Sequence, residues 1–198
     1  MKNKVRLAYL VSHPIQYQAP LLRRIAQEPD IELTVFFGSD FSVRGYQDVG
    51  FGVDVKWDVP LLDGYRYDFL PRIRDNATVT VTSPMNWGIL SRLRGSGDEA
   101  GFDVLWVHGY ATVNALHGIL AAKALGIPVL LRAESWLQDR ARSGPKLAAK
   151  RLFFRILKGL VDGVLPIGTL NAAYWHHYLG EEFPQSLMPY AVDNAYFQ

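Results

Sequence analysis

The stretch VRLAYLVSHPIQYQAPLLRRIAQE, residues 5–28, contains a strand, a loop and a helix in immediate succession. Residues 5–11 form a short apolar run that is typical of a buried strand. Residues 12–20 carry a histidine, two glutamines, a tyrosine and two prolines, whereas a connection that only turns the chain more often uses Gly, Asn, Asp or Ser. From residue 20 the apolar positions recur with helical spacing, and the proline there suits a first turn. The unit is therefore a strand joined to a helix by a loop rich in hydrogen-bonding groups.

The same alternation of strand and helix continues along the chain. Five further apolar runs are predicted as buried strands, and one more is a seventh candidate: residues 32–37, 103–107, 128–132, 163–167 and 186–189, with 65–71 as the seventh. Helical patterns lie at residues 20–28, 111–126, 146–160 and 169–180. This alternation predicts a doubly wound α/β fold with a mostly parallel sheet of six or seven strands. We expect a single Rossmann-like domain that spans residues 1–198.

The composition argues against several classes of protein. The chain has 198 residues, a net charge of +2 and no cysteine. A small positive charge without a long basic block does not indicate nucleic-acid binding, and a chain without cysteine has no disulfides, zinc–thiolate sites or cysteine nucleophiles. No apolar run approaches the roughly 18 residues of a membrane span, and the N-terminus lacks a signal-peptide core. We therefore expect a cytoplasmic protein, in which the sequon at Asn76 carries no sugar.

Three local patterns resemble known motifs but lack the context that those motifs require. GFG at residues 50–52 follows no buried strand, and GSGDEAG at residues 95–101 follows a helical segment, so neither predicts a dinucleotide site. His176 and His177 are adjacent on a helix, about 100° apart, which does not suit joint binding of one metal ion. We expect neither a metal nor a cofactor. Residues 38–64 are too long for a plain connection and are typical of a lid or binding loop.

Polar side chains follow several of the predicted strands at their carboxyl ends, where parallel sheets bind ligands. His13 follows the first strand and His108 follows the strand at 103–107, although either could equally be a loop histidine bonded to backbone. Arg132 and Glu134 are two residues apart in extended chain, so their side chains point the same way. They would form either an ion pair that closes the strand or a clamp for an anion or hydroxyl group.

A further strand end is followed by Gly168 and Thr169, at the start of the helix 169–180. Thr169 could serve only as a helix cap, but such a helix start also suits an anion. Because the carboxyl ends of parallel strands meet at one edge of the sheet, we expect one cleft lined by His13, Gln16, His108, Arg132 and Glu134.

Four stretches together resemble the N-terminal half of family-4 glycosyltransferases with the GT-B fold: YLVSHPIQYQAPLLRRIA, FDVLWVHGY, IPVLLRAES and LMPYAVDNAYF. In that family the first strand runs into an acceptor loop, and a DVxxxH strand supplies a histidine at the cleft. A P.GVD...F phrase leads into the second domain, and Ala191 stands where this phrase usually has glycine. The resemblance covers nearly the whole chain, and the closing phrase and residues 13–20 are its more specific parts.

The resemblance implies a retaining transfer of a sugar from a nucleotide-sugar donor to a glycan, lipid or other glycoconjugate acceptor, with no cofactor. It implies that His108 is the catalytic histidine that approaches the transferred sugar. The donor would bind mainly to a second domain with an E-x7-E motif, which this chain lacks, so we expect the chain alone to be inactive. We predict acceptor contacts from His13, Gln16, Tyr17, Tyr110, Arg132 and Glu134, with Gly168 and Thr169 close to a phosphate.

Other interpretations stay open. The chain could be a non-catalytic α/β module that binds a sugar or nucleotide or docks a partner, or part of another GT-B enzyme such as a sugar-nucleotide epimerase. The helix that begins at Lys146 and ends at Leu160 is typical of core packing with basic side chains beside the apolar arc. Its alternative is peripheral contact with anionic lipid at the inner membrane face, to which Phe154 would contribute. The predicted apolar arc comprises Leu152, Phe153, Ile156, Leu157 and Leu160.

Overall fold

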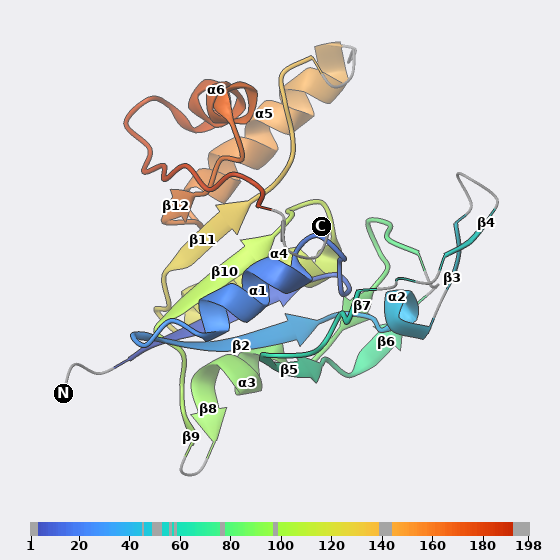
Figure 1. Cartoon of the computed structure of the whole chain (residues 1–198). Coiled ribbons are helices and arrows are strands. Elements are labelled where there is room, and N and C mark those ends of the chain that lie inside the picture. Colours follow the sequence, from blue (N-terminus) through green and yellow to red (C-terminus); the bar gives the residue numbers. More distant parts are fainter. Residues whose placement is uncertain are drawn as a thin grey trace.

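The computed structural model describes residues 4–44, 46–48, 53–55, 57, 59–75, 78–96, 99–138 and 144–191. Its centre is a six-stranded sheet in the order β12-β11-β10-β1-β2-β5 (Figure 1). Every neighbouring pair in this sheet is parallel, which confirms the predicted α/β fold class. The strands of the sheet are β1 (Val5–Val11), β2 (Ile31–Phe37), β5 (Arg66–Phe69), β10 (Val104–His108), β11 (Val129–Arg132) and β12 (Gly163–Val164).

One edge of the sheet agrees with the prediction, and the other lacks a predicted strand. The seventh candidate provides the edge strand β5, whereas the predicted strand at residues 186–189 is not formed. That segment instead lies along β12, where the Ser186 N–H donates to the Val164 carbonyl and only an isolated bridge is present. Pro184 and Pro189 bracket the segment and lack the N–H groups that a longer ladder would need, which explains the short pairing.

Alternating side chains of β1 face two layers of helices. Tyr9 and Val11 pack with Leu22 of α1 (Ala19–Ala26), which lies in front of the sheet in Figure 1. Ala8 and Leu10 point to the opposite face. Four helices pack in the core cluster on that face: α3 (Ile89–Arg94), α4 (Val113–Ala124), α5 (Gly144–Lys158) and α6 (Thr169–Leu179). Helices thus cover both faces, as a doubly wound fold requires.

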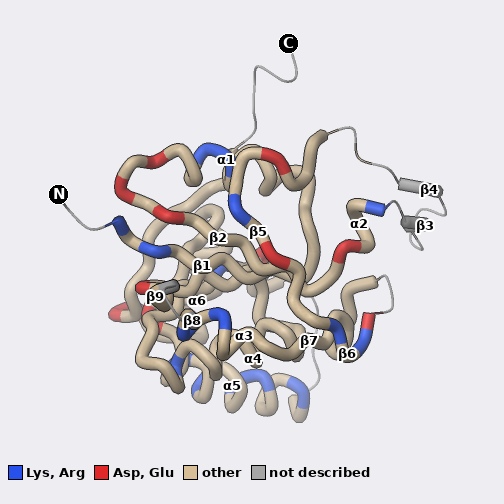
Figure 2. The backbone as a smooth tube through the Cα atoms, turned by 90° about the horizontal axis from the view of Figure 1, so that it is seen from below, with Lys and Arg blue, Asp and Glu red and all other residues tan. Residues whose placement is uncertain are grey.

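The buried face of α5 agrees only in part with the predicted apolar arc, of which Leu157 is buried and Phe153 and Leu160 pack against the core. Leu152 and Ile156 are each 59% exposed, so their assignment to the core was wrong. Phe154 is buried, so its predicted contact with lipid was also wrong. The physical reason is an aromatic cluster with α6, in which the ring centroids of Phe154 and Tyr178 lie 4.5 Å apart. Figure 2 shows basic but no acidic positions along α5.

Smaller elements surround the sheet. Three antiparallel pairs lie beside it in the described ranges: β3 (Tyr46–Asp48) with β4 (Val53–Val55), β6 (Arg72–Arg74) with β7 (Met85–Asn86), and β8 (Gly95–Ser96) with β9 (Glu99–Ala100). The first pair and α2 (Phe41–Arg44) belong to the long segment at 38–64. Gly50, Gly52 and Asn76 lie outside the described residues. Within these ranges no helix has the length and apolar character needed to span a membrane.

Candidate functional site

The carboxyl ends of β1, β10 and β11 bring four of the predicted site residues to one edge of the sheet. His108 ends β10 and pairs in register with Arg132, which ends β11. His13 follows β1, the other neighbour of β10. Glu134 follows β11, and its Oε1 lies 3.7 Å from His108 Nε2. The topology of the sheet is therefore the cause of this cluster, while the roles of its members stay predictions.

His108 is held by two residues that the sequence pattern did not single out. The Tyr9 hydroxyl donates to Gln18 Oε1 at 2.5 Å, which turns the Gln18 amide nitrogen toward the histidine. That nitrogen lies 3.0 Å from His108 Nδ1 and 3.2 Å from Nε2. Because an amide nitrogen only donates, the ring nitrogen that it contacts must accept. Buried Gln18 thus orients the imidazole ring of His108 beside Glu134.

Glu134 is exposed and accepts hydrogen bonds from two tyrosine hydroxyl groups. Its Oε1 accepts from Tyr17 at 2.9 Å and also from Tyr190, and the two tyrosine rings meet edge to face at 4.8 Å. The neighbouring His108, followed by the hydrogen bond from Tyr17, lowers the pKa of Glu134 below its ordinary value. The group is therefore a carboxylate at neutral pH and can accept further hydroxyl donors.

Arg132 is 0% exposed, although it lies at the ligand-binding edge of the sheet. It forms no ion pair with Glu134 among the described residues, so the alternative of a pair that closes the strand does not hold. Its guanidinium carbon lies 4.3 Å from the centre of the Tyr190 ring and 5.9 Å from that of Trp106. Burial lowers the pKa of this arginine, but a guanidinium stays charged at any ordinary pH.

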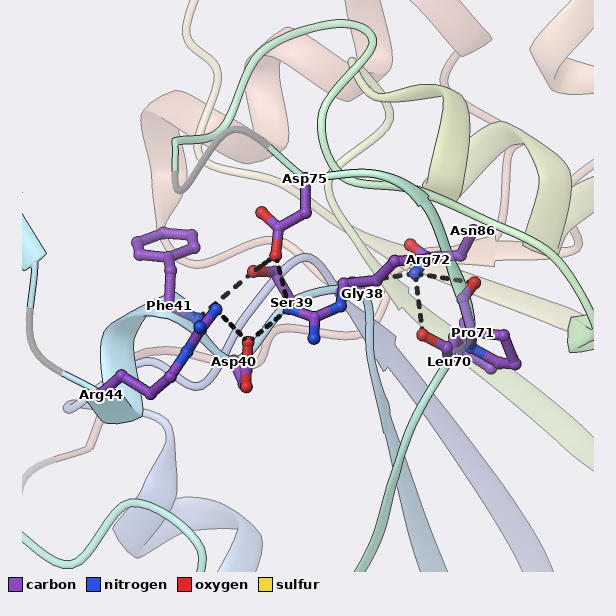
Figure 3. Close-up of polar contacts among 10 residues, drawn as sticks. All are labelled: Gly38, Ser39, Asp40, Phe41, Arg44, Leu70, Pro71, Arg72, Asp75 and Asn86. Carbon is purple, nitrogen blue, oxygen red and sulfur yellow. Dashed lines mark hydrogen bonds and ion pairs between the residues drawn. The ribbon is translucent and has the colours of Figure 1, made fainter.

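The His13 ring contacts Phe41 and Ser12. The ring packs on Phe41 with centroids 4.6 Å apart, and its Nδ1 is 2.9 Å from Ser12 Oγ. The chain around Phe41 is fixed by polar contacts drawn in Figure 3. There Asp40 Oδ1 accepts from Arg44 and from Arg72, each at 2.7 Å. In a second group of contacts beside these, Asn86 Nδ2 donates to the carbonyls of Gly38 and Leu70.

Burial, together with the charge of His108, lowers the pKa of His13 from 6.5 to about 4. The unfolded chain therefore binds this proton at a higher pH than the folded chain does, and stability falls as the pH drops through that window. We expect the free energy of unfolding to decrease by about 2 kcal/mol between pH 7.5 and pH 5 because of His13 alone. Urea unfolding of the wild type and of His13→Gln at both pH values measures this, since other groups cancel in the difference. Equal pH dependence of the two proteins would contradict it.

Two predicted acceptor residues make no hydrogen bond to His108 or Glu134 in the described structure. Gln16 is half-buried and makes no hydrogen bond within the described part of the chain. The Tyr110 hydroxyl lies 2.7 Å from both Ser135 Oγ and the Tyr174 hydroxyl, and its ring packs against Phe154 of α5. The contacts of Tyr110 therefore belong to the packing between β10 and the helices, and its contact with an acceptor remains a prediction.

Gly168 and Thr169 share a pocket of about 460 Å³ with Glu134. Gly168 is the N-cap of α6, and no side chain caps this helix start, so the interpretation of Thr169 as the cap was wrong. Trp136, which is 40% exposed, lines the same pocket. An aromatic surface, a carboxylate and a helix N-terminus thus border one opening.

Asn171 fixes the chain that carries Glu134. It is 4% exposed, and its Nδ2 donates to the carbonyls of Ala133 at 2.9 Å and Ser135 at 2.6 Å. Its Oδ1 accepts from the Ile167 N–H and from Trp175 Nε1, each at 3.1 Å. A single polar side chain in α6 therefore positions the residues on both sides of Glu134. An asparagine inside a predicted helix gave no sequence signal for this role.

A larger pocket, of about 760 Å³, lies between β2, β5 and α3. Two of its arginines already have acidic partners: Arg6 pairs with Asp103 at 3.2 Å, and Arg92 with Asp68 at 2.7 Å. We therefore place the candidate site at the carboxyl edge and not in this pocket. The described residues contain no group of three or more His, Asp or Glu side chains that could hold a metal ion.

A comparison with known protein families and with curated proteins finds no match. Two solved structures are similar to the chain. A UDP-N-acetylglucosamine 2-epimerase matches with a TM-score of 0.55 and 14% identity, over 93% of this chain and 48% of the epimerase chain. TcCGT1 in complex with UDP matches with a TM-score of 0.53 and 11% identity, over 93% of this chain and 50% of its own. The chain thus spans about half the length of each, and it has the Rossmann-like fold found in one half of such GT-B proteins.

Proposed function

We propose that this chain is the acceptor-binding domain of a retaining glycosyltransferase that uses a nucleotide-sugar donor. The observation that carries the proposal is the arrangement of His108 and Glu134 on neighbouring strand ends, oriented by Gln18 and Tyr17. The UDP-related names of both similar structures support a nucleotide-sugar substrate. The acceptor would be a glycan, a lipid or another glycoconjugate.

The geometry suits the binding of a sugar acceptor. A carboxylate such as Glu134 accepts hydrogen bonds from sugar hydroxyls, and the half-buried imidazole of His108 lies beside it. His108 would contact the reacting sugar, with Glu134 orienting the acceptor. Hydrogen bonds that strengthen as charge develops in the transition state are the ones that accelerate a reaction. The donor would bind to a second domain that faces this edge.

A direct test uses calorimetric titration of the 198-residue chain. We expect little heat with UDP-, GDP- and ADP-sugars, because a cleft enzyme binds its donor with both walls. Micromolar affinity of the isolated chain for any of them would place the donor site in this half and contradict the proposed division of roles.

An epimerase is the second candidate, because one of the two similar structures is a UDP-N-acetylglucosamine 2-epimerase. The two activities differ in their need for an acceptor. The protein that contains this domain together with a donor domain would be incubated with a UDP-sugar alone and with added acceptors. Conversion of the sugar without an acceptor would favour the epimerase, and turnover of neither kind would favour a non-catalytic module.

Peripheral membrane contact is a further part of the proposal. Leu152 and Ile156 are exposed one helical turn apart on α5, next to Arg151 and Arg155 and with no acidic residue in the helix. Such a face suits anionic lipid. We expect the chain to sediment with vesicles that contain anionic lipid but not with neutral vesicles, and Leu152→Ser combined with Ile156→Ser to weaken this binding. Equal recovery with both kinds of vesicle would contradict the contact.

A further inference from the structure

The guanidinium of Arg132 is a buried cation with no hydrogen-bonded or ion-paired partner in the described structure, and the carboxylate of Glu134 acts on it only through its charge. The residue is 0% exposed, and none of Nε, Nη1 and Nη2 has a hydrogen-bond acceptor among the described residues. Trp106 Nε1, on the neighbouring strand, is also buried and without an acceptor. Buried donors are nearly always paired in native proteins, and a buried charge is costly unless it is neutralised. The donors of Arg132 and Trp106 at this end of the sheet are therefore unpaired, because the nearby carboxylate of Glu134 accepts from Tyr17 and Tyr190 instead.

The groups that pack on Arg132 are aromatic. The Tyr190 ring lies 4.3 Å from the guanidinium carbon and that of Trp106 lies 5.9 Å away. Ring faces attract a cation, but they accept no conventional hydrogen bond from its N–H groups. The five donors of an arginine match the paired oxygens of a carboxylate or phosphate. The missing partner is thus an anion.

The Tyr190 side chain covers the Arg132 guanidinium and is held there by side-chain contacts. Its hydroxyl donates to Glu134, and its ring meets Tyr17 edge to face. These are side-chain contacts, because the last backbone hydrogen bond of the segment in the described residues is donated by Met188 to the Pro166 carbonyl at 2.7 Å. The phenol bonds Glu134 with a hydroxyl and covers Arg132 with a ring, and a sugar could make the same two contacts.

We propose that the acceptor carries an anionic group, a carboxylate or a phosphate, which binds Arg132 in the space that the Tyr190 ring now fills. That the ligand is an acceptor rests on the proposed function, whereas the anion site itself does not. Arg132 is paired in register with His108, and neighbouring strands lie about 4.8 Å apart. One sugar unit can therefore contact His108 and Glu134 while its anionic group reaches Arg132.

The test compares three sugars that differ only at carbon 6: glucose, glucuronate and glucose 6-phosphate. Each is titrated into the 198-residue chain that carries Tyr190→Ala, with binding followed by calorimetry and by tryptophan fluorescence, to which Trp106 contributes. We expect at least one anionic sugar to bind ten-fold or more tightly than glucose. Preference for glucuronate would indicate a carboxylate acceptor, and preference for the phosphate would indicate a sugar or lipid phosphate. Equal affinity for all three, or binding of none, would overturn the proposal.

Variants assign the preference to one side chain. Arg132→Met in the Tyr190→Ala background should abolish the anion preference, and Arg132→Lys should keep part of it because the charge remains. Arg92→Met is the matched control, because that arginine pairs with Asp68 in the distant pocket, and it should leave the preference unchanged. A preference that survives in Arg132→Met, or that is lost in Arg92→Met, would refute the site.

The failure of the proposal and the failure of the proposed function are distinguishable. In one outcome, the anion binds at Arg132 while the protein that also has a donor domain transfers no sugar. That result would refute the transferase function but would support the anion site. Sugar transfer to an acceptor at a rate that Arg132→Met does not change would refute the anion site and leave the transferase.

Discussion

Asn171→Leu is expected to lower the free energy of unfolding of the chain by about 4 kcal/mol. The substitution keeps the volume but removes a donor and an acceptor that together serve four groups, in two buried and two partly buried hydrogen bonds. Each buried polar group that loses its partner costs roughly 1–3 kcal/mol, and relaxation recovers part of the total. Urea unfolding followed by circular dichroism measures the difference. The loss should be accompanied by greater mobility of Glu134, because two of the bonds hold its neighbours.

Leu170→Ala is the matched control for this experiment. Leu170 precedes Asn171 in α6 but is 66% exposed, so its truncation should change stability by less than about 0.5 kcal/mol. A loss below about 1 kcal/mol for Asn171→Leu would show that water or other groups replace the four bonds, and that Asn171 does not position the loop.

His108→Ala, introduced into a protein that contains this domain and a donor domain, is expected to lower kcat/KM by roughly 10²-fold or more. The proposed contact of the imidazole with the reacting sugar acts mainly in the transition state, so kcat should fall with kcat/KM. The cost in stability should be only about 1 kcal/mol, because the Gln18 amide that loses its partner is close to the opening at Glu134 and can bind water. Initial rates, corrected for the folded fraction, measure the effect.

His176→Ala provides the control, since His176 is an exposed histidine on α6 and should change neither rate nor stability. A purely structural His108 would give the opposite pattern. Stability would fall by several kcal/mol, as for other buried network residues, and the remaining folded molecules would have full activity. That result would remove His108 from the catalytic assignment.

Most of the sheet was predictable because its strands are buried on both faces. Runs such as residues 5–11 and 103–107 are almost continuously apolar, and in a chain that also shows glycine-terminated helices this pattern is typical of a parallel sheet. The edges were harder to predict. β5 has exposed charged residues at an edge, while residues 186–189 are apolar but flanked by prolines, so hydrophobicity alone ranks the two runs in the wrong order.

The candidate site was predictable only where strand ends reveal it. His108, Arg132 and Glu134 follow from topology, because parallel strands place their carboxyl ends together. The roles of Tyr9 and Gln18 could not be predicted from topology. A tyrosine within an apolar strand is normally interpreted as a core residue, and the sequence of one loop does not show which of its two glutamines contacts the histidine. Tyr190 reaches the site from a distant part of the sequence. Such contacts depend on side-chain packing, which periodicity does not encode.

The central position of β1 has a consequence for how the chain folds. One edge of β1 pairs with β2, which follows shortly after it in the sequence, but the other pairs with β10, where Leu7 lies opposite Val104. During synthesis at about 5–20 residues per second, the second edge waits on the order of ten seconds for its partner. An apolar strand with one free edge can pair with other chains in that interval. A nascent chain that ends before β10 should therefore aggregate or bind chaperones, and non-local pairing should make refolding slow.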